Sequence, residues 1–122
     1  MVAALHLWAS IERNGHPSVG YYHQQPWYLQ SGYREAAVRP SEDDFQAASR
    51  VAGIVTLMAQ RGDHARSSAL TVYYGAFPGA LDMTKNQRQR MWLHENDRYT
   101  LRDFYRLKTE AERLIEGAIV YG

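Results

Sequence analysis

The chain has 122 residues, of which 45% are hydrophobic and 22% charged, with no cysteine and a formal net charge of +1. This composition is typical of one compact domain, and the lack of thiols excludes disulfides, thiol nucleophiles and zinc sites built on thiolates. No stretch approaches the roughly 18 apolar residues of a membrane span, and the first residues lack the basic leader of a signal peptide, so we expect a cytoplasmic protein that does not enter a membrane.

A single domain over 1–122 is expected, with an N-terminal part (1–40) that precedes a helical core (41–122). The apolar residues Leu5, Trp8 and Ile11 recur at helical spacing and predict a short helix over 2–13. Asn14 and Gly15 then provide a stop signal.

The segment 16–40 is predicted to be a long, partly ordered loop, because prolines and glycines interrupt it and aromatic residues lie between them. Loops of this length are uncommon in small domains and are often functional. The aromatic side chains could stack on unpaired bases, but almost no positive charge accompanies them, so packing or a protein interface is the favoured interpretation. The residues concerned are Pro17, Gly20, Tyr21, Tyr22, Pro26, Trp27, Tyr28, Gly32, Tyr33 and Pro40.

Three helices are predicted in the middle of the chain, each from a capping residue followed by apolar residues at helical spacing. Acidic residues follow the first cap, and Gln87 follows the third in a capping-box pattern. Glycines end the first two helices. The expected caps are Ser41, Asp63 and Thr84, and the expected helices cover 41–62, 63–75 and 84–94.

The final helix, 100–117, has the clearest pattern. Thr100 is expected to cap it, with Asp103 three residues further on. Because no alternating run of β-branched residues appears anywhere, the chain is predicted to be all-α. The predicted buried stripe of this helix is Leu101, Phe104, Leu107 or Lys108, Ala111, Leu114 or Ile115, and Ala118.

Basic residues are concentrated in 84–113, which carries eight Lys/Arg and five Asp/Glu, whereas 1–83 carries six Lys/Arg and seven Asp/Glu. A local basic excess favours a polyanionic partner. Helices 84–94 and 100–117 also have the proportions of a helix-turn-helix, in which the second helix enters the major groove of DNA by its N-terminal half.

Three arginines and a threonine share one face of the final helix, at spacings of four, three and four residues. Arginine can hold two acceptors of a guanine edge or neutralise phosphates, and a helix start can hold a phosphate. The same pattern also fits a solvated outer face, in which Arg106 pairs with Glu110. The predicted contacts to double-stranded DNA are Arg102, Arg106, Thr109 and Arg113 on the face, Arg98 and Thr100 at its start, and Lys85, Arg88 and Arg90 on the preceding helix.

Three segments of the C-terminal half resemble region four of bacterial sigma factors. "SSALTVYYG" (67–75) resembles its first helix, which typically carries a tyrosine before a turn, and "TKNQRQRMWL" (84–93) stands where its supporting helix would be. "YTLRDFYRLKTEAERLIEG" (99–117) resembles its recognition helix, including an alanine three residues before a leucine. Preceded by the leucine-and-tryptophan helix "LHLWASIERNG" (5–15) and its loop, this order is similar to phage late-gene antitermination proteins of the Q type.

This resemblance implies a function in transcription that is not enzymatic. Such proteins bind a DNA element that overlaps a late promoter, load onto RNA polymerase paused just downstream, and suppress pausing and termination in the bacterial host cytoplasm. Some members carry a cysteine-based zinc finger, which this chain cannot form, and the polymerase-binding residues and the oligomeric state stay open. The positions carried over are Arg102, Tyr105, Arg106 and Thr109 on the recognition helix, with Arg98 and Thr100 at its start.

An enzyme is the less favoured interpretation, and no catalytic residue, cofactor or metal site is predicted. The five histidines show no His-Glu-x-x-His pattern, and no glycine loop that would cradle a phosphate is present. A metal-dependent nuclease that uses Asp43, Asp44 and Asp63 is one alternative, although acids at a helix start more often serve as caps. The other alternative is a protein-binding helical module that acts on the transcription machinery without specific DNA binding.

Overall fold

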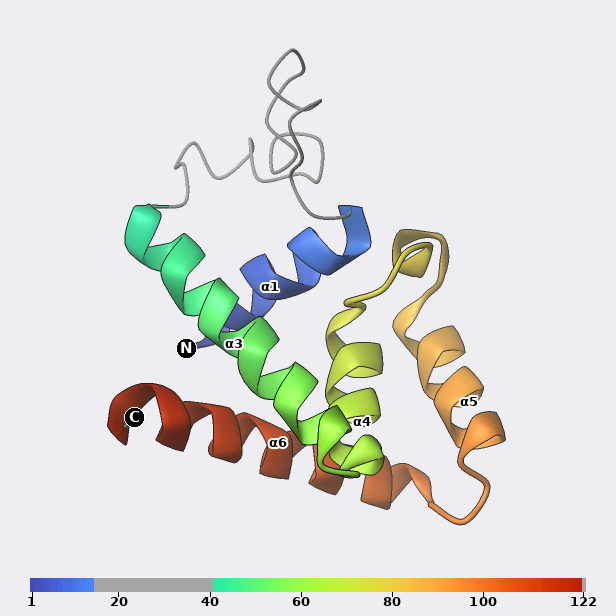
Figure 1. The fold of residues 1–122 in the computed structure, drawn as a ribbon. Coiled ribbons are helices and arrows are strands. Elements are labelled where there is room, and N and C mark those ends of the chain that lie inside the picture. The colour runs from blue at the N-terminus through green and yellow to red at the C-terminus, as the bar shows by residue number, and fades with distance from the viewer. Residues whose placement is uncertain (15–40, 122) are drawn as a thin grey trace.

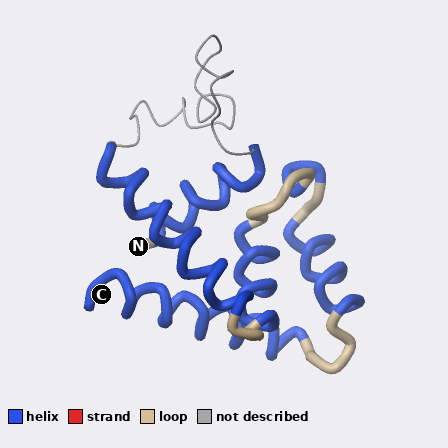
Figure 2. Tube along the Cα trace, in the orientation of Figure 1, coloured by secondary structure: helices blue, strands red, loops and turns tan. Residues whose placement is uncertain are grey.

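The computed structural model describes residues 1–14 and 41–121. Those residues form helices joined by loops, without any strand (Figure 2), so the all-α prediction is confirmed. The predicted aromatic loop over 16–40 falls outside the described residues, and its suggested roles stay predictions. The elements are α1 (Val2–Asn14), α3 (Glu42–Gln60), α4 (His64–Tyr74), the 3-10 helix η3 (Ala80–Asp82), α5 (Lys85–Glu95) and α6 (Leu101–Tyr121).

Helix α4 lies at the centre of the fold and contacts α1, α3, α5 and α6. In Figure 1, α4 and α5 run side by side and α6 crosses below them. Different residues of α4 pack into two hydrophobic clusters. Leu70 belongs to the first, with Leu5 of α1 and Val51 of α3. Val72 belongs to the second, with Trp92 of α5.

Helix α6 joins the two clusters, because its buried stripe is long enough to cross both. Phe104 and Leu107 pack into the cluster shared by α4 and α5. Ala111 and Ile115, further along the same stripe, pack into the cluster of α1, α3 and α4. The N-terminal half of α6 is therefore held by α4 and α5, and its C-terminal half by the rest of the core.

Three residues of the predicted stripe are exposed. Leu101 is 46% exposed and Leu114 is 49% exposed, so their prediction as core residues is wrong. The centre of the stripe follows Phe104, Leu107, Ala111 and Ile115, which are three or four positions apart. Leu101 and Leu114 lie at its edge, where the neighbouring helices do not cover them. Ala118 is exposed for the same reason.

Three of the four predicted caps bond the helix backbone through their side chains. Ser41 and Thr84 form capping boxes with the residues three positions on. The Thr100 hydroxyl likewise accepts the backbone N–H of Asp103 at 3.2 Å. Asp63 occupies the N-cap position of α4, as predicted, but its carboxylate accepts the guanidinium of Arg66 at 3.0 Å and does not bond the backbone of α4.

The C-terminal end of α4 is closed by a glycine and by two arginines. Gly75 adopts a left-handed conformation (φ +66°), and the N–H groups of Gly75 and Ala76 bond back to Val72 and Thr71 in a Schellman arrangement. Helix ends leave carbonyls without helical partners. Arg13 donates to the carbonyls of Tyr74 and Gly75, and Arg88 donates to those of Val72 and Tyr73, so α1 and α5 are both tied to the end of α4.

Helix α6 is long, but its polar residues exclude it as a membrane span. The other helices of the described residues likewise lack the length or the continuous apolar character that crossing a membrane requires.

Candidate nucleic-acid interface

The candidate interface is the face of α6 opposite its buried stripe. Because residues three and four positions apart lie on one side of a helix, Arg102, Arg106 and Arg113 share this side. Phe104 and Ala111 are fully buried on the other. The three arginines are exposed and Thr109 is half-buried among them. We call this side the outer face of α6.

The outer face carries cations that no carboxylate of the described residues neutralises. Within residues 1–14 and 41–121, Arg102 and Arg113 take part in no ion pair, and the same holds for Arg98 and Arg90. All four side chains are exposed. These arginines can therefore meet an anionic partner without first breaking an internal contact.

Arg106 differs from its neighbours because two carboxylates of α6 hold it. Its Nη2 lies 3.4 Å from Oδ1 of Asp103, and its Nη1 lies 3.4 Å from Oε2 of Glu110. The pair with Glu110 confirms the ion pair that the sequence suggested. Glu110 also accepts the Nε of Arg66 at 3.0 Å, and Arg66 reaches Asp63. A chain of ion pairs therefore runs from the outer face to the start of α4.

Hydrogen bonds favour the charged forms of two members of this network of ion pairs, Asp103 and Arg66. The backbone N–H of Thr100 lowers the pKa of Asp103 below its ordinary value, and the Thr100 hydroxyl and Arg106 act in the same direction. Hydrogen bonds to Asp63 and Glu110 raise the pKa of Arg66.

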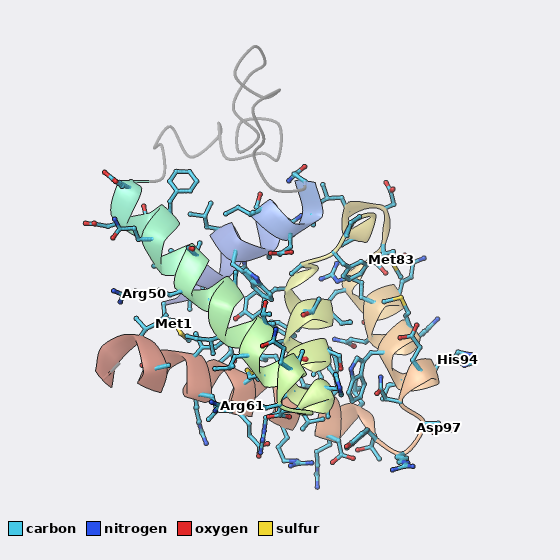
Figure 3. The ribbon with its side chains drawn as sticks, in the orientation of Figure 1. Met1, Arg50, Arg61, Met83, His94 and Asp97 are labelled. Atoms are coloured by element: carbon cyan, nitrogen blue, oxygen red, sulfur yellow. The ribbon has the colours of Figure 1, made fainter. Side chains whose placement is uncertain are left out.

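The connection between α5 and α6, residues 96–100, is anchored to the core. Asn96 donates its side-chain N–H to the Trp92 carbonyl at 2.8 Å and so caps α5. The ring of Tyr99 packs against Trp92, with centroids 5.6 Å apart. Trp92 in turn donates to the Ser68 hydroxyl at 2.9 Å. These contacts set the direction in which the chain leaves α5 and enters α6, and Figure 3 shows Asp97 at the outer edge of this turn.

Tyr105 has a structural contact as well as an exposed edge. Its hydroxyl accepts the side-chain N–H of the buried Gln89, which ties α6 to α5. Its ring also meets Tyr73 edge to face at 6.2 Å. The side chain is 39% exposed, so part of the ring borders the outer face.

Not every predicted DNA contact faces solvent. Arg88, predicted to contact the DNA backbone, directs its guanidinium inward to the carbonyls of Val72, Tyr73 and Met83. This side chain is used to stabilise the fold. Lys85 is exposed, but its ammonium donates to the Tyr73 hydroxyl and lies 4.3 Å above that ring.

One further basic residue of 84–113 is also withdrawn from the surface. The ammonium of Lys108 also lies 4.3 Å from the centroid of the Tyr73 ring, and it pairs with Glu112 at 2.9 Å. Glu112 also accepts a hydrogen bond from the Tyr74 hydroxyl. Burial, and to a lesser extent this hydrogen bond, raises the pKa of Tyr74. Fewer basic side chains are therefore available to a partner than the number of Lys/Arg residues in 84–113 suggests.

The three carboxylates of the nuclease alternative do not come together. Asp43 and Asp44 lie in the first turn of α3, and Asp63 follows its end, so the 19 residues of the helix separate them by roughly 28 Å. Asp44 is also used as a cap, and the Ser41 backbone N–H lowers its pKa. Among the described residues, no group of three His, Asp or Glu is placed to hold a metal ion.

Arg66 is the part of this site that the sequence reasoning missed. It lies 44 positions before Glu110, and neither a motif nor a helical spacing links the two. Asp103 and Glu110 were recognisable from their spacing to Arg106, but only as components of a helix surface.

The chain matches no protein-family model, and it matches neither a curated protein nor a solved structure. The function must therefore be argued from the chain's own residues and geometry.

Proposed function

We propose that the protein binds double-stranded DNA through the outer face of α6, with α5 and α6 acting as a helix-turn-helix. The observation that carries this proposal is the set of exposed arginines on one side of a helix whose other side is packed against α4 and α5. An α-helix fits the major groove, where arginine can hold two acceptors of a guanine edge. The proposed contacts are Arg98, Thr100, Arg102, Tyr105, Arg106, Thr109 and Arg113, with Lys85 and Arg90 toward the backbone.

The way α6 is supported favours this function. Phosphate contacts position a protein on DNA and base contacts give specificity, so a reading helix has to be held firmly. Here Phe104 and Leu107 fix the N-terminal half of α6 to its neighbours. The connection over 96–100 has five residues, whereas three or four are usual in this motif.

Within this proposal the protein is a transcription antiterminator of the phage Q type, acting in the cytoplasm of a bacterial host. Support comes from the resemblance of 67–75, 84–93 and 99–117 to sigma region four and from the basic face just described. The protein would bind at a late promoter, load onto paused RNA polymerase and suppress termination.

The first experiment is selection from a pool of random duplex DNA at two salt concentrations, with the purified protein. Enrichment of one sequence at both concentrations is expected, because base contacts persist when phosphate attraction is screened. Read-through of a terminator downstream of a promoter that contains this sequence then tests the antiterminator function. Weak, salt-sensitive binding without enrichment would contradict specific recognition.

Arg102→Ala and Arg106→Ala should each weaken binding to the selected sequence by about 1–3 kcal/mol if a base contact is lost. Affinity is measured by fluorescence anisotropy on a labelled duplex. The matched control is Arg50→Ala, which removes the same charge from an exposed residue of α3 that lies beside Ala118 and Ile119, far along α6 from the two arginines under test (Figure 3). Equal effects of all three substitutions would show that the outer face is not the interface.

A protein-binding module is the second candidate function. The ion pairs of Arg106 favour it, because a face that is partly neutralised by its own carboxylates attracts DNA less strongly. In that case the substitutions on the outer face would leave DNA affinity unchanged and would weaken binding to RNA polymerase.

A further inference from the structure

We propose that Arg106 is the residue of α6 that reads a base, and that Asp103 and Glu110 are positioning residues that orient its guanidinium. This inference rests on the proposed DNA binding and assigns different tasks to the arginines of the outer face. Arg102 and Arg113 neutralise phosphates, whereas Arg106 supplies sequence discrimination.

The geometry around Arg106 holds its guanidinium from both sides along the helix. Asp103, one turn earlier, accepts from Nη2, and Glu110, one turn later, accepts from Nη1. Two of the five N–H donors are used in this way, so three remain. The side chain is still 52% exposed, and the remaining donors are enough for the two acceptors of a guanine edge.

Each of the two carboxylates is itself held by a second contact. The Oδ2 atom of Asp103 accepts the backbone N–H of Thr100 at 2.9 Å, at the start of α6. The Oε1 atom of Glu110 accepts Arg66 of α4 at 3.0 Å. One anchor is the backbone at the start of α6 and the other is a side chain of α4, so contacts outside the Arg106 side chain favour one orientation of its guanidinium.

Base reading and phosphate neutralisation make different demands on an arginine. A bidentate contact to one base edge needs a fixed plane and direction, and preorientation reduces the entropy that is lost on binding. A phosphate accepts charge from many directions. Arg102 and Arg113, which form no ion pair within the described residues, suit the second task.

The carboxylates also have an effect of their own. Asp103 and Glu110 place negative charge beside the proposed DNA surface, and this charge repels phosphates at every sequence alike. Such repulsion lowers the affinity for non-specific DNA. Specificity is the difference between the affinity for the preferred sequence and the affinity for other sequences. The same pair therefore favours discrimination in two ways.

The test compares the wild type with Asp103→Asn and Glu110→Gln, singly and together, on the selected duplex and on a scrambled duplex at one salt concentration. Both substitutions keep the size of the side chain, and asparagine retains an oxygen that can accept the Thr100 N–H. We expect tighter binding to the scrambled duplex and no gain on the selected one. The specificity ratio should fall about tenfold in the double variant, as for loss of a bidentate contact.

Arg106→Lys and Arg113→Lys provide the matched pair of arginine substitutions. Both keep the charge and remove the planar fork. Arg106→Lys should lower the specificity ratio about tenfold, whereas Arg113→Lys should change both affinities equally. Thermal unfolding of each variant identifies any that is misfolded. If the double carboxylate variant is misfolded, the specificity ratios of Asp103→Asn and Glu110→Gln are compared instead.

A modified base distinguishes reading from a merely structural role. With 7-deazaguanine at the contacted guanine, which removes one acceptor, the wild type should lose affinity and Arg106→Lys should lose nothing further. A specificity ratio that is unchanged in the double variant, or that falls equally in Arg113→Lys, would overturn the inference while DNA binding stands. A wild type without any preferred sequence would overturn the proposed function and the inference together.

Discussion

At the scale of single residues, basic side chains close together on α5 have different tasks. Arg88 lies against the end of α4 and donates to three carbonyls at 2.9, 3.3 and 3.2 Å. Arg90, two positions on, is exposed and forms no ion pair within the described part of the chain. Position on the helix therefore decides whether an arginine stabilises the fold or is free to meet a partner.

Arg88→Ala should lower the free energy of unfolding by about 2 kcal/mol, because it removes charged donors from carbonyls at a half-buried helix end. Arg90→Ala should change that free energy by less than about 0.5 kcal/mol, as is usual for an exposed residue. Urea unfolding followed by circular dichroism measures both. Equal stability of the two variants would show that Arg88 does not cap α4.

At the scale of the helices, two glycines have opposite roles. Gly75 ends α4 with a positive φ of +66°, and a Cβ atom there would lie 3.2 Å from the Cβ of Ala80. Gly53 lies inside α3, and an added Cβ would meet nothing within 4 Å. A left-handed turn favours glycine, whereas a helix interior favours alanine.

Gly75→Ala should destabilise the protein by about 1–2 kcal/mol, because alanine is strained in the left-handed region. Gly53→Ala should stabilise it by about 0.5–1 kcal/mol, because alanine loses less backbone entropy in a helix. The free energies of unfolding in urea provide the comparison. Changes of the same sign in the two variants would contradict the helix ends described here.

At the scale of the whole molecule, net charge contributes little to DNA attraction. The total is only +1, and several basic residues of 84–113 are paired or turned inward. Attraction must then come from a local surface, since exposed charges separated by more than about 10 Å are largely screened at 0.1 M salt. The outer face of α6 provides such a surface.

The dependence of DNA affinity on salt tests this local origin. Arg113→Ala should reduce the slope of log affinity against log salt concentration by about 1, because one phosphate contact is lost. The slope is obtained from titrations at several salt concentrations. Arg50→Ala, which changes the net charge equally, should leave the slope unchanged, and a similar reduction in both variants would show that only total charge matters.

Much of the fold was predictable from local features of the sequence. Capping residues such as Ser41 and Thr84 act on their own helix within three positions, and Gly75 acts on the turn that contains it. The period of Phe104 and Leu107 likewise depends only on the geometry of α6. The all-α class followed from such signals and is confirmed, whereas DNA binding by the outer face stays a prediction.

The tertiary structure alone decided which charged groups face solvent and which are used inside. Arg88 and Arg102 have similar local patterns, but the end of α4 lies against the first, whereas no described residue covers the second. Arg66 meets Glu110 only because α4 and α6 pack together. A helical period determines which residues share a face, but long-range packing determines what that face meets. The sequence therefore determined the helices and the position of the arginine face, and only the packing of α4 against α5 and α6 decided which arginines that face presents.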